Sequence, residues 1–319
     1  MEIILQNSDI LIMLGIGFGL FMAWGIGAND VANAMGTSVG SGAITFRQAI
    51  IIAVIFEFAG AVLAGGEVTA TVRKGILDAG AFTDTPHLLV YGMLAALLAA
   101  ASWLFIASSL GWPVSTTHSI VGAIVGFAAV CIGSEFVQWG KVGSIASSWV
   151  VSPLLAGTIS FGIFKSVQIL ILDRPDQFQR AQKFIPGYIF IVGFVICMVT
   201  LLKGLKHVGI QFSAAESLAL AAAFGAFLAV VGRFLISRIK ETAGGGRQGK
   251  HSDLEKVFAV LMVFTACSMA FAHGSNDVAN AIGPLAAIVN AVENVDLTAK
   301  APVAPVSYTH LTLPTILLV

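Results

Sequence analysis

The sequence has little charge and no excess of either sign. Of its 319 residues only 11% are Asp, Glu, Lys or Arg, and 17 basic residues balance 17 acidic ones. A soluble domain carries about a quarter charged residues, so the composition excludes that class. A neutral chain also lacks the basic surface that binds DNA or RNA, and we expect no nucleic-acid partner.

Cysteines are few and isolated. Cys131, Cys197 and Cys267 lie on apolar segments and form no Cys-x-x-Cys pair. This spacing argues against a zinc site or a disulfide framework, and we interpret the three residues as small buried apolar side chains. No cofactor is expected.

The chain has long apolar runs instead. Hydrophobic residues make up 57% of it, and its mean hydropathy is +0.92. A helix of about 20 residues crosses the ~30 Å hydrocarbon core of a bilayer. The runs of this length lie at 10–33, 48–66, 88–110, 114–133, 144–172, 186–203, 214–237 and 254–276. They predict an all-α polytopic membrane protein in the lipid bilayer, with the first run retained because no signal-peptide pattern precedes it.

One ten-residue motif occurs twice, each time at the end of an apolar run. Residues 27–36 read GANDVANAMG and residues 274–283 read GSNDVANAIG, so eight of ten positions are identical. An Asp at mid-bilayer depth costs roughly 2.5–3.5 kcal/mol, and two in matching contexts indicate a shared function. Asn29 and Asn33 share a helix face beside Asp30, and Gly36, Gly40 and Gly42 favour an unwound segment directly after the motif.

Charges in the loops predict the orientation of the chain. Basic residues gather at Arg174, Arg180 and Lys183 and around the Gly-rich loop 244–249, whereas residues 1–9 contain no Lys or Arg. The positive-inside rule places both loops in the cytoplasm and the N-terminus outside, in a multi-pass protein of the cell (inner) membrane. Seven crossings then separate the two motifs, so the second copy is inverted, as in secondary transporters with broken helices.

The predicted organisation has four parts. Residues 1–172 form the first inverted repeat, 173–253 the linking spans and loops, and 254–304 the start of an incomplete second repeat. Residues 305–319 resemble translated vector sequence, and we expect them to be a foreign tail on a truncated reading frame.

A second polar cluster follows a break in an apolar run. The stretch 111–118 reads GWPVSTTH and predicts a re-entrant hairpin tip or a discontinuous helix. Ser115, Thr116 and Thr117 begin the helix that follows, where free N–H groups and hydroxyls make an uncharged anion site. His118 is either near the substrate or a packing residue.

Two carboxylates near such an anion site would repel the anion unless a cation or a proton lies between them. Asp30 and Asp277, with the oxygens of Asn29, Asn33, Asn276 and Asn280, are hard ligands that suit sodium, and the same carboxylates could instead bind protons. A carboxylate also accepts a hydrogen bond from hydrogen phosphate, which fully ionised sulfate cannot donate. The pattern therefore predicts cation-coupled symport of an oxyanion, with phosphate ahead of sulfate.

Glu57 is an acid within an otherwise apolar span. Acids at membrane depth are functional candidates by default, although a structural acid paired inside the bundle is the alternative.

At these residues the sequence resembles the inorganic phosphate transporter (PiT) family. The resemblance is carried by residues 27–43, by Glu57 with 73–76, by 111–122 and by 274–284, and it covers about residues 10–290. It implies about a dozen helical spans in inverted halves with central hairpins, homodimers, and symport of inorganic phosphate with sodium or protons.

The resemblance also implies roles for single residues. It places Asp30, Ser115, Thr116 and Thr117 on phosphate and makes Glu57 essential for transport. Phosphate and cation binding are shared by the remaining motif residues, Asn29, Asn33, Asn276, Asp277 and Asn280, with sodium at Asn29 and Asn276. A second Ser-Thr-Thr-His tip, which the family implies for the C-terminal half, is absent from this chain.

Three other functions are alternatives. A sulfate permease of the same fold is the nearest. An intramembrane hydrolase using Ser115, His118 and Asp30 is disfavoured, because Ser-x-x-His on one helix is no nucleophile elbow and a duplicated Asp has no role in one triad. A channel is disfavoured, because the sequence shows no selectivity-filter pattern.

Overall fold

The structure, a computed structural model, describes residues 7–66, 76–77, 82, 85–202, 212–241 and 252–293. In these ranges the chain is helical and forms no strand, apart from one β-bridge between Leu77 and Val137. The predicted tail at 305–319 and the end of the second repeat at 294–304 lie outside the described residues, as does the Gly-rich loop. The predicted all-α class is confirmed.

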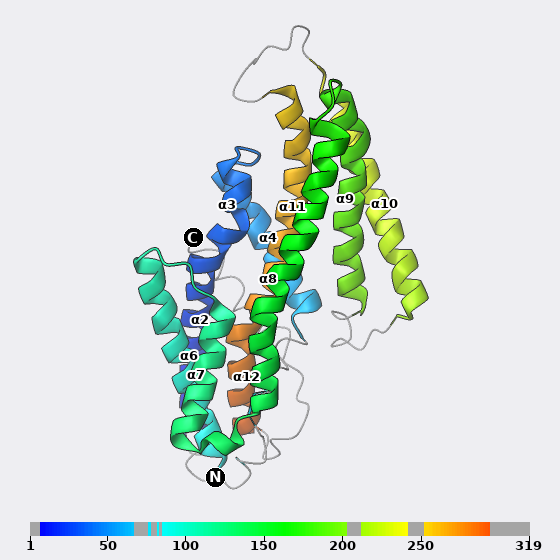
Figure 1. The fold of residues 1–319 in the computed structure, drawn as a ribbon. Helices are drawn as coiled ribbons and strands as arrows, with labels where there is room; N and C mark the ends of the chain where they lie inside the picture. The colour runs from blue at the N-terminus through cyan, green and yellow to red at the C-terminus, as the bar shows by residue number, and fades with distance from the viewer. Residues whose placement is uncertain are drawn as a thin grey trace.

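The described helices run in chain order as follows (Figure 1). They are α2 (Ser8–Ile26), the π-helical turn η1 (Gly27–Val31), α3 (Ala32–Gly40), α4 (Phe46–Ala64), α6 (Pro86–Ser109), α7 (Thr116–Cys131), the 3-10 turn η3 (Ser134–Phe136), α8 (Trp139–Val167), the π-helical turn η4 (Gln168–Leu172), α9 (Gln177–Leu202), α10 (Ala214–Ser237), α11 (Asp253–Asp277) and α12 (Ala279–Glu293).

Seven helical segments in the described ranges are long and apolar enough to cross a membrane. They match seven of the eight predicted spans. The eighth, at 114–133, is wrong as a full span, because α7 has only 16 residues. It packs against α6 instead, and the two form a helical hairpin whose turn contains Gly111 at φ +69°. The predicted hairpin tip at 111–118 is thus present.

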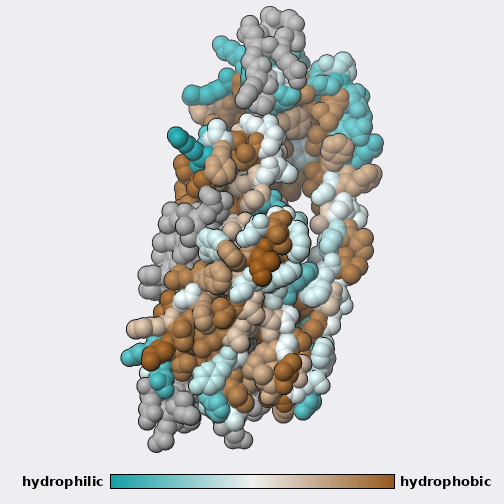
Figure 2. Space-filling view, turned by 90° about the vertical axis from the view of Figure 1, so that its left-hand side faces the viewer, coloured by the Kyte–Doolittle hydropathy of each residue, from teal (hydrophilic) through white to brown (hydrophobic). Residues whose placement is uncertain are grey.

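Apolar side chains cover much of the outer surface (Figure 2). The extreme case is α8, which has no buried residue although it carries Trp149, Leu154 and Phe161. Such a surface is stable only against hydrocarbon or another apolar partner, as expected for a multi-pass membrane protein. The interior is packed by three apolar clusters: one joins α2, α6, α7 and α12, one joins α3, α4 and α11, and one joins α9, α10 and α11.

The three cysteines are not the buried side chains that we expected. Cys131 is exposed at the end of α7, and Cys197 and Cys267 are partly exposed. All three are free thiols. Cys197 and Cys267 line an apolar cavity of about 330 Å³, which leaves them partly exposed, and Cys131 is the last residue of α7.

Both motifs lie where a long helix is interrupted. The first occupies η1, a π-helical turn between α2 and α3, and the second spans the turn at Val278 between α11 and α12. The unwound segment predicted directly after the first motif is not found, because α3 continues to Gly40. Single π turns inside helices are frequent at functional sites.

The two interrupted helices run in opposite directions. In Figure 1 the α2–α3 segment rises from the end of the molecule marked N, whereas α11 and α12 descend. Although α7 is too short to be a full span, it reverses the direction of the chain by folding back on α6. Antiparallel motif helices are what inverted copies require, while the inverted repeat itself stays a prediction.

Glycines let α4 and α11 approach closely at the centre of the molecule. A Cβ added to Gly274 would collide with the Glu57 carbonyl oxygen, and one added to Gly60 would collide with the Phe271 carbonyl oxygen. The two backbones are therefore in contact where Glu57 faces α11. Close helix approach through small residues is the usual packing of membrane helices.

The tip of the α6–α7 hairpin is bonded to the first motif. The Asn29 carboxamide donates to Ser108 Oγ (3.2 Å) and to the Trp112 carbonyl (3.0 Å), and its Oδ1 accepts from the Val114 N–H (3.1 Å). Asn29 is buried, so these bonds replace water for the unpaired backbone groups of the turn. The π turn and the hairpin tip thus hold a fixed relative position.

Replacing Gly274 with Ala should push α4 away from α11. Overpacking of a close contact costs about 1–3 kcal/mol, and here the colliding atom is backbone and cannot rotate aside. We expect a lower melting temperature for the purified protein in detergent. Gly122→Ala on α7, where an added Cβ meets nothing within 4 Å, is the control; equal melting of the two variants would contradict the close crossing.

Replacing Asn29 with Ala should loosen the hairpin tip, because the Val114 N–H and the Trp112 carbonyl lose their side-chain partner. Leaving buried polar groups unpaired costs about 1–3 kcal/mol, which should lower the melting temperature. Asn33→Ala is the matched control, since among the described residues Asn33 donates to the Asn29 carbonyl, one turn earlier in the same helical segment, and not to the hairpin tip. Equal destabilisation by Asn33→Ala would contradict the role of Asn29 in holding the hairpin tip.

Candidate functional site

A polar cavity of about 470 Å³ lies between the interrupted helices and the hairpin tip. Its lining comes from η1 and α3, from the start of α7, and from α11. The residues are Asp30, Asn33, Ala34, Ser115, Thr116, Met269, Ala272, His273, Asn276 and Asp277. Both motifs and the hairpin tip, which are far apart in sequence, therefore meet at one cavity.

Both aspartates lie near Nε2 of one imidazole, that of His273. Side-chain ligand atoms of Asp30, His273 and Asp277 all lie within 4.8 Å of one another. The aspartates are mostly buried, with 16% and 17% of their side chains exposed. Two carboxylates this close in a poorly hydrated site repel each other strongly unless positive charge lies between them.

Asp277 is held by hydroxyls of the hairpin tip. Thr116 Oγ1 donates to Asp277 Oδ1 at 3.0 Å, and Thr117 Oγ1 lies 3.4 Å from the same oxygen. Asn280 Nδ2 in turn donates to Thr117 Oγ1 at 3.0 Å. The hydroxyls of the hairpin tip thus orient the carboxylate of the second motif. The other oxygen of Asp277, Oδ2, lies toward His273.

Ser115 begins α7 as predicted. Its Oγ accepts a hydrogen bond from the His118 N–H at 3.2 Å, which makes Ser115 the N-cap of the helix. It also lines the cavity, so the positive end of the α7 dipole faces this space. Capping uses one of the three hydroxyls, and the other two bind Asp277.

His118 points elsewhere. Its ring packs against Trp149 of α8, with centroids 3.9 Å apart and the planes tilted by 37°, and it does not line the cavity. Of the two readings that we kept open, this geometry fits the packing role. The backbone N–H of His118 bonds to Ser115 Oγ, but the imidazole itself takes no part in the cavity lining.

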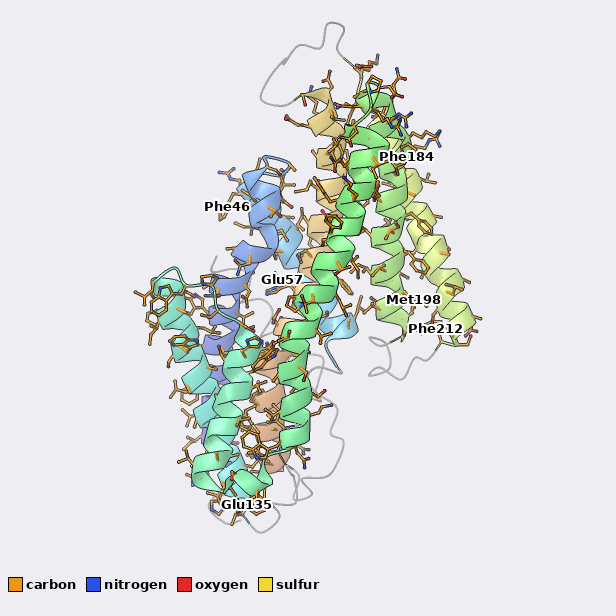
Figure 3. All side chains as sticks on the ribbon, viewed as in Figure 1. Phe46, Glu57, Glu135, Phe184, Met198 and Phe212 are labelled. Atoms are coloured by element: carbon orange, nitrogen blue, oxygen red, sulfur yellow. The ribbon has the colours of Figure 1, made fainter. Side chains whose placement is uncertain are left out.

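Glu57 is fully buried on α4, near the middle of the molecule (Figure 3). It does not line the cavity. Its Oε1 lies 2.9 Å from Nδ1 of His273, and that pair connects it to the aspartates. The close crossing at Gly274 brings the two side chains together.

The structure thus sorts the predicted site residues into layers. The cavity wall contains Asp30, Asn33, Ser115, Thr116, Asn276 and Asp277, and behind it lie Thr117 and Asn280, which bond to that wall. Asn29, predicted as a cation ligand, has its carboxamide bonded to the hairpin tip, and Glu57 contacts the site only through His273.

His273 was missed by the sequence analysis. The comparison of the two motifs pointed to identical residues, and the position of His273 in the first copy is Ile26. A signal was present, because His273 lies four residues before Asp277 on the same helix face. A lone histidine in an apolar helix next to a polar motif would have singled it out.

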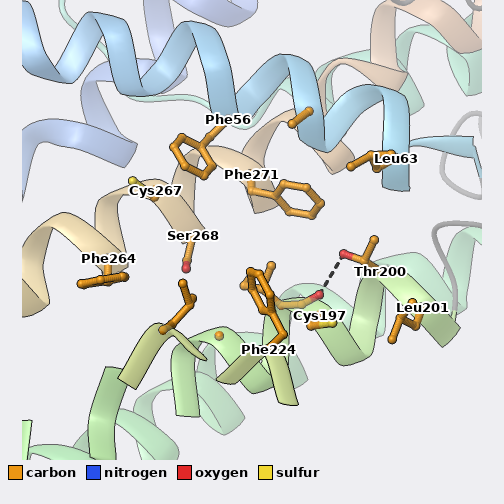
Figure 4. A pocket seen from close by; sticks show the side chains of 14 residues that line it. Phe56, Leu63, Cys197, Thr200, Leu201, Phe224, Phe264, Cys267, Ser268 and Phe271 are labelled. Atoms are coloured by element: carbon orange, nitrogen blue, oxygen red, sulfur yellow. Dashed lines mark hydrogen bonds between the residues drawn. The ribbon is translucent and has the colours of Figure 1, made fainter. Parts of the chain in front are cut away.

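A second cavity, of about 330 Å³, has a different character. It lies between α4, α9, α10 and α11 and is lined by Phe56, Phe271 and Phe224, whose rings point into it (Figure 4). None of its lining residues is charged. An ion would leave water there without a charged partner, so the polar cavity is the candidate site.

Comparison with known proteins adds to this geometry. The profile of the Phosphate transporter family matches residues 26–318. A Haemophilus influenzae protein whose name places it among phosphate permeases is 52% identical over 295 residues, which are 92% of this chain and 69% of that protein. Inorganic phosphate transporter 2-1, chloroplastic, of Arabidopsis thaliana is 41% identical over 87% of this chain and 50% of its own length.

A solved structure described as the sodium-dependent phosphate transporter superposes on this one. Its TM-score is 0.86 at 36% identity, and the match covers 97% of this chain and 76% of that chain. The profile covers most of the sequence, and the fold, the duplicated motif and the central cavity accord with it. The chain therefore belongs to the phosphate transporter family.

Proposed function

We propose that this chain carries inorganic phosphate across the membrane by symport with sodium, through alternating access to the polar cavity. The observation that carries the proposal is the meeting of Asp30 and Asp277 in one cavity lined by hydroxyls. Two converging carboxylates oppose the binding of an anion, and the lining has no Lys or Arg to offset them. A bound cation removes this repulsion, and binding of anion and cation then becomes interdependent.

Phosphate is favoured over sulfate by the carboxylates themselves. A phosphate that carries a proton can donate a hydrogen bond to Asp30 or Asp277, whereas sulfate leaves that acceptor unpaired. Sites built around such a bond discriminate strongly against analogues that lack it. Strong inhibition of phosphate uptake by excess sulfate would favour the sulfate permease instead.

Sodium is favoured over protons by the amide oxygens and by one comparison. Asn33 and Asn276 line the cavity beside the carboxylates, and oxygen ligands of this kind suit a hard cation. The solved relative is described as sodium-dependent. We assign sodium to the carboxylates with Asn33 and Asn276, phosphate to Asp30, Ser115, Thr116 and Asp277, and positioning of the hairpin tip to Asn29.

The alternatives from other classes have less support. The family and the solved relative are transporters, not enzymes, so the intramembrane hydrolase is set aside. The His118 ring packs against Trp149, so it is not the base for Ser115 that the hydrolase hypothesis assigned. A homodimer, an outside N-terminus and location in the inner membrane stay predictions.

Vesicles containing the purified chain should take up labelled phosphate when a sodium gradient is imposed. A proton gradient without sodium should give little uptake, because sodium is proposed to fill the space between the carboxylates. The Haemophilus influenzae relative, reconstituted in parallel, checks the assay. Uptake driven by the pH gradient alone would show that protons, not sodium, are the coupling ion. No uptake under either gradient would contradict symport.

Replacing either aspartate with Asn should abolish uptake without unfolding the protein. Asp277→Asn keeps an oxygen that accepts from Thr116, while it removes the charge that faces sodium. Removing one partner of a buried ion pair costs about 3–5 kcal/mol, so uptake should fall at least about 100-fold. Asp176→Asn, at an exposed aspartate paired with Arg180, is the control and should transport normally. Normal uptake by Asp30→Asn or Asp277→Asn would remove that carboxylate from the mechanism.

A further inference from the structure

His273 lines the polar cavity but has no role in the proposed function. It is the only residue with an imidazole among those that line the described cavity, and 9% of its side chain is exposed. Its ring lies between three carboxylates. Glu57 is on the Nδ1 side at 2.9 Å, and Asp277 and Asp30 are on the Nε2 side at 3.5 Å and 4.0 Å.

The two ring nitrogens have different surroundings. Nδ1 bonds to Glu57 Oε1, which fixes the rotation of the ring because Glu57 is itself fully buried. Nε2 has no hydrogen-bond partner among the described residues, although it is buried. A buried polar atom without a partner costs free energy, so its retention at a cavity wall points to a ligand.

The backbone crossing restricts how this pair can move. Gly274 follows His273 directly and lies against the Glu57 carbonyl. The imidazole and the carboxylate are thus carried on two backbones in contact, on α11 and α4. The second oxygen of Glu57, Oε2, has no described hydrogen-bond partner, so the carboxylate is held through the contact of Oε1 with His273.

We propose that His273 is a phosphate-contacting residue, whose Nε2 bonds to the anion between Asp30 and Asp277, and that Glu57 is a positioning residue that acts through His273. This inference rests on the proposed function. It gives the anion a nitrogen partner in a cavity whose other ionisable groups are carboxylates. It also explains how an acid outside the cavity wall can control binding.

Two substitutions of His273 separate the two nitrogens. The terminal amide of Gln reaches approximately the position of Nε2, and that of Asn approximately the position of Nδ1. If Nε2 contacts phosphate, His273→Gln keeps a partner for the anion and His273→Asn does not. If the only role is the bond to Glu57, the order is reversed.

The measurement is sodium-driven uptake of labelled phosphate in vesicles at several phosphate concentrations. We expect His273→Asn to raise the apparent KM for phosphate about 10- to 100-fold, which corresponds to one lost hydrogen bond to a charged group. His273→Gln should have a KM clearly closer to the unsubstituted chain. A smaller rise for Asn than for Gln, or no rise for either, would overturn the contact.

Glu57 is tested by a double-mutant cycle, because coupling between two side chains appears as non-additivity. Glu57→Gln alone should raise the apparent KM, since the ring loses the charge that orients it. In a His273→Ala background the same change should have no further effect on KM. Additive effects would show that Glu57 does not act through His273.

Folding and function are controlled separately. Each variant is compared by melting temperature, and if His273→Asn does not fold, the comparison of Glu57→Gln with and without His273→Gln tests the same coupling. If the unsubstituted chain takes up no phosphate, the proposed function fails and this inference fails with it. Normal uptake by that chain with unchanged KM in every variant overturns this inference alone.

Discussion

The structure depends on two carboxylates that face each other within an apolar bundle of helices. Asp30 and Asp277 come from motifs almost at opposite ends of the described chain, and their oxygens meet within a few ångströms of His273. Such an arrangement is unfavourable by itself, since burial and like charge both oppose ionisation of the second carboxylate. In the proposed function a bound cation offsets these electrostatics, and the need for that cation couples its binding to the binding of the anion.

The surrounding helices hold the carboxylates in place without lysine or arginine. Thr116 and Thr117 bond to Asp277 from the hairpin tip, and Asn29 fixes that tip against the π turn that carries Asp30. Glycine at position 274 lets α4 approach until Glu57 reaches His273. Each support crosses from one motif or helix to another, so a shift of the hairpin or of α11 would change both sides of the cavity together. A site of this kind can bind two ions tightly in one conformation and release them in another.

Much of this could be predicted from the sequence. The lengths of the apolar runs predicted the membrane-spanning helices, and the repeated GxNDVANAxG pattern identified both aspartates and the amides around them. The Gly-Trp-Pro break indicated the hairpin. The length of α7 was overestimated, because hydropathy does not distinguish a full span from half of a hairpin. His273 could have been singled out as a histidine next to the second motif, but its partners, like those of Asn29, depend on which helices cross and on the direction of each side chain at the crossing. The second hairpin that the family implies has no counterpart in the described residues.

Equilibrium binding of labelled phosphate to the purified protein, with and without sodium, tests the central claim most directly. If the carboxylates hold the anion only through a shared cation, binding is strong in sodium, is lost in choline, and is lost in sodium when either Asp30 or Asp277 is replaced by Asn. Equal phosphate binding in choline and in sodium by the unsubstituted chain would contradict the account.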